Sequence, residues 1–197
     1  MKLETGSNPK SVNKKVSIQV KLGGRSFSAD HSEVAGAEQV EFIIDTPRVT
    51  LAPREEVTLS NAADILRITG KPCRINEQSV CSELQADIVA IMAIDTKALE
   101  AIVSKWGSRA SFTTPLLDMR HSNEECLTID VSERVCYLRF YNQGLQRAVA
   151  YEATSAEDVL LRVAEWLKTD NATTIYIKGS SSVVKLLRKY YKRVICE

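Results

Sequence analysis

The pattern of residues 126–191 constrains the fold most strongly. Three short runs alternate apolar and polar residues, which is the period of half-buried strands, and turn-forming residues separate them. The runs are followed by an amphipathic helix, a fourth strand and a second helix. The predicted strands are 126–131, 135–141, 145–151 and 173–178, and the predicted helices are 156–168 and 182–190. This β-β-β-α-β-α order predicts an α/β unit.

The preceding part of the chain has a similar outline. Residues 16–22 alternate as a strand, and Gly23-Gly24 is a two-residue hairpin signal because both positions tolerate positive φ. The further predicted elements are strands at 25–28, 40–44, 48–52 and 87–94 and helices at 60–67 and 96–106, while 73–85 is ambiguous. The strand at 87–94 is almost continuously apolar, as expected of a strand buried on both faces. We therefore expect two related lobes.

This outline divides the chain into four parts. Residues 1–15 are polar and lysine-rich, and we expect a flexible leader. We expect the first lobe at 16–110, an interlobe connection at 111–125 and the second lobe at 126–197. The connection contains Pro115 but is partly apolar, so we expect it to pack across the lobes.

Composition excludes several classes of protein. The 26 basic and 25 acidic residues give a net charge of +1, so nucleic acid is an unlikely partner. No apolar run approaches the roughly 20 residues needed to span a membrane, and the N-terminus lacks the apolar centre of a signal peptide. The five cysteines are odd in number and widely spaced, which favours a cytoplasmic location. Without a CxxC motif, and with only two histidines, a structural zinc site is not expected.

The repeated unit resembles the actin, sugar-kinase and heat-shock ATPase superfamily, whose halves have ribonuclease H-like folds. The sequences VSIQVKLGGRSFS at 16–28, VTLAP at 49–53 and IYIKG at 175–179 are similar to a family of uncharacterised short bacterial proteins, a domain of unknown function. That family has a reduced actin-like ATPase fold, and the resemblance covers about residues 16–190. It implies two ribonuclease H-like lobes in a reduced actin-like ATPase architecture.

The resemblance also implies where a nucleotide would bind. The superfamily places ATP between two hairpins, each with an Asp-x-Gly pattern whose carboxylate holds hydrated magnesium and whose glycine lets backbone N–H groups approach phosphate. Here the first pattern reads Lys21-Leu22-Gly23 and the second Asp130-Val131-Ser132, so each keeps half of the motif. The implied nucleotide-binding residues are Lys21, Gly23, Gly24, Asp130, Ser132, Gly179 and Ser180, with Asp130 as the one metal ligand.

A purely structural interpretation is available for each of these residues, and we favour it. Asp130 is then a turn residue that makes local hydrogen bonds, and Lys21 an exposed strand residue. Residues 179–182 form either an anion site at a helix N-terminus or simply an N-cap.

Other chemistries are not supported by the sequence. A two-metal nuclease needs more carboxylates than Asp130 with Glu157 or Asp158, because Lys178 and Ser180 follow the fourth strand. His31 and His121 lie in polar connections, where we expect exposed loop residues, and there is no Gly-x-Ser-x-Gly motif. The basic run 185–193 fits the solvated face of an amphipathic helix.

The sequence therefore predicts a degenerate actin-like protein with no assigned catalytic residue. We expect it to act by binding or assembly, with a protein partner or with itself, because Lys21 stands where the chemistry needs an acid. The alternative is a small ATP-dependent phosphotransferase, similar to sugar kinases or pantothenate kinases, with nucleotide in the interlobe cleft. ATP and magnesium are possible ligands but are not favoured.

Overall fold

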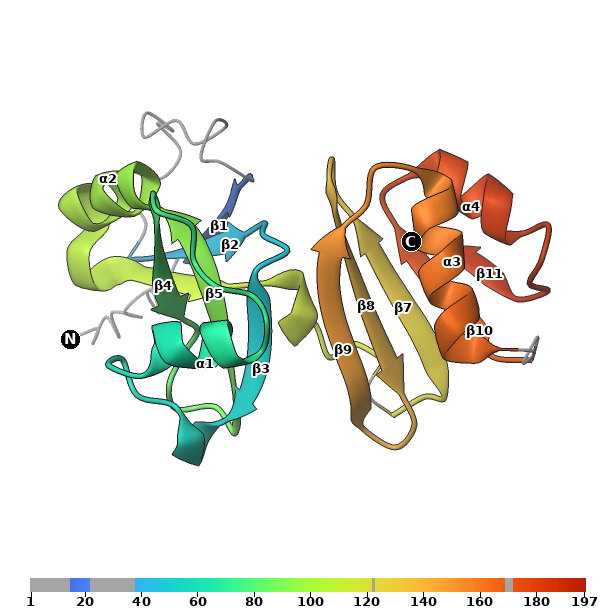
Figure 1. Ribbon diagram of the computed structural model, residues 1–197, viewed down its shortest axis with the longest axis horizontal. Helices are drawn as coiled ribbons and strands as arrows, with labels where there is room; N and C mark the ends of the chain where they lie inside the picture. Colours follow the sequence, from blue (N-terminus) through green and yellow to red (C-terminus); the bar gives the residue numbers. More distant parts are fainter. Residues whose placement is uncertain (1–14, 22–37, 122, 169–171) are drawn as a thin grey trace, which may run out of the picture.

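The computed structural model describes residues 15–21, 38–121, 123–168 and 172–197 (Figure 1). The described strands are β1 (Lys15–Val20), β2 (Gln39–Ile44), β3 (Val49–Pro53), β4 (Glu77–Cys81), β5 (Ile88–Asp95), β6 (Ala110–Thr113), β7 (Cys126–Val131), β8 (Val135–Tyr141), β9 (Leu145–Glu152), β10 (Thr174–Lys178) and β11 (Val194–Cys196). The helices are α1 (Ala62–Ile68), α2 (Thr96–Trp106), α3 (Ala156–Leu167) and α4 (Ser181–Leu187), and η4 (Pro115–Leu117) is a 3-10 turn.

The first half contains two three-stranded sheets, with orders β1-β2-β6 and β3-β5-β4. Strand β5 is central in the second sheet, and its alternate side chains enter two different cores. Ala90, Met92 and Ile94 face a core that α2 covers, whereas Val89 and Ile91 face a core that α1 covers. This two-sided burial explains the almost continuous apolar run that predicted the strand.

The second half is one five-stranded sheet of order β11-β10-β7-β8-β9. Strands β7, β8 and β9 pair antiparallel, whereas β10 pairs parallel with both β7 and β11. Helices α3 and α4 cover one face and bury an apolar stripe each. Helix α3 begins with a capping box, in which the Ser155 hydroxyl accepts the Asp158 N–H at 3.2 Å and the Asp158 carboxylate accepts the Ser155 N–H at 3.1 Å.

The two halves share one core. Val135 and Tyr137 of β8 and Ala150 of β9 are buried together with residues of β2, β5 and α2. The Tyr137 hydroxyl donates to Asp45 Oδ1 at 2.8 Å and accepts the Thr46 N–H at 2.9 Å. Leu116 of η4 belongs to the same core, so the predicted packing of this segment across the lobes is confirmed.

Sheet order in the first half differs from that in the second. Strand β1 pairs with β2 in parallel, and β2 pairs in parallel with β6, whereas β7, β8 and β9 form an antiparallel meander. Alternation of apolar residues indicates a strand but does not specify its partner. The similar sequence outlines of the two halves therefore did not predict their different strand pairing. The expected hairpin strand 25–28, Gly23-Gly24 and His31 lie outside the described residues, as does almost all of the predicted leader.

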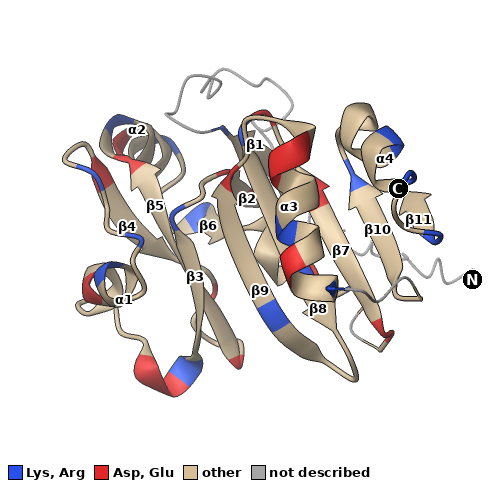
Figure 2. Cartoon of the chain, turned by 45° about the vertical axis from the view of Figure 1, so that its right-hand side comes forward, with Lys and Arg blue, Asp and Glu red and all other residues tan. Residues whose placement is uncertain are grey.

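Charged residues of both signs lie on α1, α2 and α3, and a basic residue lies within β9 (Figure 2). This distribution agrees with the balanced net charge of +1. Among the described residues, no helix combines the length and apolar character needed to cross a membrane.

Lys71 joins the halves at the rim of the shared core and predicts a pH dependence of stability. Its Nζ donates to Val49 O at 2.7 Å and to Ala150 O at 3.0 Å, and burial lowers the pKa of Lys71 from 10.5 to about 8. Between about pH 8 and 10.4 the unfolded chain therefore binds one more proton than the folded chain, so stability from this group rises with pH.

We expect this rise to be on the order of 1–3 kcal/mol and to be absent in Lys71→Met. Urea unfolding of both proteins at pH 8 and pH 10 measures it, with the exposed Lys97→Met as a matched control that keeps the wild-type slope. Equal pH slopes for the wild type and Lys71→Met would contradict the assignment.

Candidate functional site

A cavity of about 370 Å³ lies between the two halves, at the ends of β1 and β2 on one side and of β7 and β10 on the other. It brings together four residues that the sequence implied for nucleotide binding. The described lining residues are Gln19, Lys21, Ile43, Asp45, Pro115, Asp130, Val131, Ser132, Glu133, Tyr137, Lys178 and Gly179. Gly23 and Gly24, which the sequence also implied, lie outside the described residues.

Strand register places the second-half residues at the cavity. Strands β7 and β10 are parallel neighbours with Asp130 opposite Lys178, so both strands end at the same edge. Gly179 follows with φ of +112°, and a Cβ at this position would lie 2.1 Å from the carbonyl oxygen of Val131. Glycine is therefore required here by the close approach of two strands, whether or not a phosphate binds.

Ser180 is not among the residues that line the cavity. It precedes α4, and its hydroxyl lies 2.7 Å from the Ser182 hydroxyl instead of capping the helix. Because α4 has only seven residues and the hydroxyls of Ser180 and Ser182 bond each other, the possible anion site at 179–182 gains no support.

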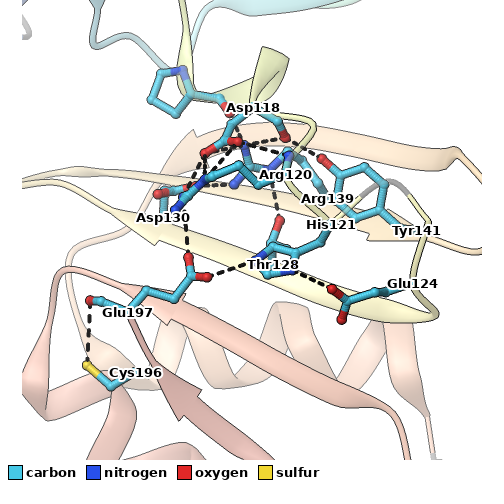
Figure 3. Close-up of polar contacts among 11 residues, drawn as sticks. Asp118, Arg120, His121, Glu124, Thr128, Asp130, Arg139, Tyr141, Cys196 and Glu197 are labelled. Carbon is cyan, nitrogen blue, oxygen red and sulfur yellow. Dashed lines mark hydrogen bonds and ion pairs between the residues drawn. The ribbon is translucent and has the colours of Figure 1, made fainter.

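Asp130 is paired with a buried arginine. Its carboxylate accepts from Arg139 Nη2, and the side chains of Arg139 and Asp130 are 3% and 13% exposed. Arg139 also donates to Thr128 Oγ1 at 2.8 Å, to Pro115 O and to Asp118 O at 3.2 Å (Figure 3). Burial raises the pKa of Asp130 above its usual value, and the charges of Arg139 and Lys178 oppose this rise.

Lys21 forms an ion pair with Glu133 of the β7–β8 turn. The contact joins the end of β1 to the second half across the cavity. The two side chains are 40% and 71% exposed, so the pair contributes little to stability. Lys21 presents a positive charge to the cavity and cannot coordinate a metal ion.

The described lining residues do not fit a magnesium ion. Magnesium needs carboxylate or water oxygens in a near-octahedral shell. Each of the three lining carboxylates already has a partner, because Asp45 accepts from Tyr137, Asp130 from Arg139 and Glu133 from Lys21. A bound metal would have to displace a buried guanidinium from Asp130. The lining also carries the amines of Lys21 and Lys178, which repel a cation, and Lys21 is itself paired with Glu133.

A larger cavity of about 620 Å³ lies in the first half, beside β6. Glu41, Asp87, Arg109 and Phe112 are among its lining residues, and none of the implied nucleotide-binding residues lies in its described lining. Size alone therefore does not select a functional site, and we take the smaller interlobe cavity as the candidate.

Sequence reasoning missed Arg139 and Tyr137, which fix the chemistry of the cavity. One signal for Arg139 was present, since it is the only charged residue of β8, an otherwise apolar strand. A cation in a buried strand needs an acidic partner, and Asp130 is the acid on the neighbouring strand.

The prediction that His121 is an exposed loop residue was wrong. Its side chain is 15% exposed, and its ring stacks on Tyr176 with centroids 4.0 Å apart. Nδ1 lies 3.0 Å from Glu124 Oε1, and Nε2 lies 2.8 Å from Glu197 Oε1. The polar loop is held against the sheet because these two carboxylates bond the ring from opposite sides, as Figure 3 shows.

Comparisons with known proteins concern the fold. No protein-family model matches the chain, and no curated protein matches it. A solved structure of a protein of unknown function with an actin-like ATPase fold, from Bacteroides thetaiotaomicron, aligns with a TM-score of 0.68 and 19% identity over 82% of this chain and 69% of that chain.

Two further solved structures align with lower scores. The AlfA filament bound to AMPPNP has a TM-score of 0.40 and 11% identity over 83% of this chain and 54% of that chain. The cytoplasmic domain of EpsL, an inner-membrane component of the type II secretion system of Vibrio cholerae, has a TM-score of 0.39 and 10% identity over 75% and 63%. The alignment with the Bacteroides structure shows that the chain has an actin-like ATPase fold in a reduced form.

Proposed function

We propose that this protein is a non-catalytic member of the actin-like fold, which acts in the cytoplasm by binding a protein partner or by self-assembly. The observation that carries the proposal is the pairing of Asp130 with the buried Arg139. This pairing occupies the carboxylate that a magnesium-dependent ATPase of this fold would use, while Lys21 stands at the corresponding position of the first half. The five free cysteines support the proposed location, because the cytoplasm is a reducing compartment in which cysteines stay unpaired.

A second candidate is an ATP-dependent phosphotransferase. The observation in its favour is the interlobe cavity, because Lys21, Lys178 and Gly179 line it together. Two amines attract phosphate groups without a metal ion. The second candidate therefore requires that ATP binds at this cavity and that its terminal phosphoryl group is transferred to an acceptor.

Calorimetric titration with ATP separates the two candidates. We expect no ATP binding either with magnesium or with EDTA, whereas the phosphotransferase requires binding in at least one of these two conditions. Sedimentation velocity over a range of protein concentrations then tests self-association, and a strictly monomeric protein leaves a partner protein as the binding target.

Micromolar, magnesium-dependent binding that Asp130→Asn abolishes would overturn the non-catalytic proposal. The asparagine keeps the size of the side chain and removes its charge. Asp64→Asn is the matched control, because Asp64 is 66% exposed and pairs with Arg67 on the surface of α1.

A further inference from the structure

His121, Glu124 and Cys126 form a compact group at the start of β7. One ligand atom from each residue, a ring nitrogen, a carboxylate oxygen and the sulfur, lies within 4.8 Å of the others. None of the three residues is among the described residues that line the interlobe cavity. We propose that these three residues form a binding site for a divalent transition metal of the zinc class.

The donor set indicates the kind of metal. A thiolate, an imidazole nitrogen and a carboxylate oxygen are all ligands of zinc, whereas magnesium and calcium take oxygen ligands alone. His121 Nδ1 and Glu124 Oε1 are 3.0 Å apart. Two such ligands at about 2.0–2.1 Å from a tetrahedral zinc ion lie roughly 3.3 Å from each other. Little movement of these two groups is therefore needed, and the Cys126 sulfur, which lies within 4.8 Å of both, is the third ligand after a larger movement.

The surrounding residues already orient the ligands. Glu197 Oε1 lies 2.8 Å from His121 Nε2, the ring nitrogen that points away from Glu124. Tyr176 donates its hydroxyl to Glu124 Oε2 at 2.8 Å and stacks its ring on His121. A carboxylate on the second ring nitrogen and a hydrogen bond to the ligating carboxylate are the supports that metal-binding histidine and carboxylate residues have in proteins.

Cys126 distinguishes this site from a simple ion pair. Its side chain is buried, and its sulfur lies within 4.8 Å of a ligand atom of His121 and of Glu124. A core cysteine without a role needs no histidine and carboxylate within reach of its sulfur. The site matches no known zinc motif because it has a single cysteine and a His-x-x-Glu-x-Cys spacing, which no cysteine-pair motif covers.

Cobalt substitution tests the proposal on the full chain. The EDTA-treated protein is titrated with Co²⁺ alone and followed by absorption, and zinc binding is measured separately by calorimetry. We expect one equivalent per chain, with a thiolate-to-cobalt charge-transfer band that Cys126→Ala removes. Cys196→Ala is the matched control, because Cys196 is an exposed cysteine of β11 in the same sheet and its loss should leave the band unchanged.

Two milder variants keep the test valid if Cys126→Ala fails to fold. Glu124→Gln changes a side chain that is 48% exposed and should weaken zinc binding at least tenfold. Glu197→Gln, which acts through His121, should weaken it by roughly 10–100-fold. Absence of a thiolate band, or zinc affinity that Glu124→Gln leaves unchanged, would overturn the site. Neither result bears on nucleotide binding at the interlobe cavity.

Discussion

Replacing Arg139 with methionine will destabilise the fold by about 3–5 kcal/mol, because the change leaves a buried carboxylate without its partner. Asp130 is 13% exposed, so water cannot fully replace the guanidinium. The carbonyl oxygens of Pro115 and Asp118 lose the same donor. Urea unfolding followed by far-UV circular dichroism measures the loss.

The double variant Arg139→Met with Asp130→Asn should recover part of this free energy, because it removes the unpaired charge. Arg67→Met is the control for loss of an arginine, since Arg67 and Asp64 are 67% and 66% exposed and their pair should be worth less than about 1 kcal/mol. A loss below about 1 kcal/mol for Arg139→Met would mean that Asp130 is not held by Arg139 in solution.

Replacing Gly179 with alanine should cost about 3 kcal/mol or more, through two separate effects. The φ of +112° disfavours any side chain, and the new Cβ would lie 2.1 Å from a backbone carbonyl oxygen that belongs to β7. The clash involves backbone atoms of Val131 and not the end of a flexible side chain, so it is relieved only if strands β7 and β10 move apart. Thermal and urea unfolding of the purified variant measure this cost.

Gly144→Ala separates the two effects. Gly144 has φ of +121°, but a Cβ there meets nothing within 4 Å. The control therefore carries the backbone strain alone, about 1 kcal/mol. Equal losses for the two variants would refute the close approach of the strands and reopen a role for Gly179 that depends on ligand.

The second half was predictable because its signals are local. Each strand of the meander is followed at once by its partner, and Ser155 with Asp158 marks the start of α3 within four residues. Strand β11 was missed, because three residues after a basic run carry too little periodicity to identify a strand. The parallel pairing of β1 with β2 depends on contacts between distant segments and is not encoded in either strand alone.

The candidate site was predictable in position and not in chemistry. The resemblance to actin-like ATPases placed Lys21, Asp130 and Gly179 near one another, and all three line the interlobe cavity. What the carboxylate does depends on Arg139, which approaches from the next strand. The proposed metal ligands His121, Glu124 and Cys126 are close in sequence, but their spacing matches no cysteine-pair motif, and Glu197, which supports His121, lies 76 positions away.

The shared core has a consequence for how any ligand enters the cavity. A hinge between two domains requires an interface that can open without exposing apolar side chains, yet Tyr137 and Ala150 are buried among residues of the other half. The aperture is therefore fixed when the chain folds and does not close around its occupant. A ligand of this cavity would therefore have to fit an opening that the folded core already sets.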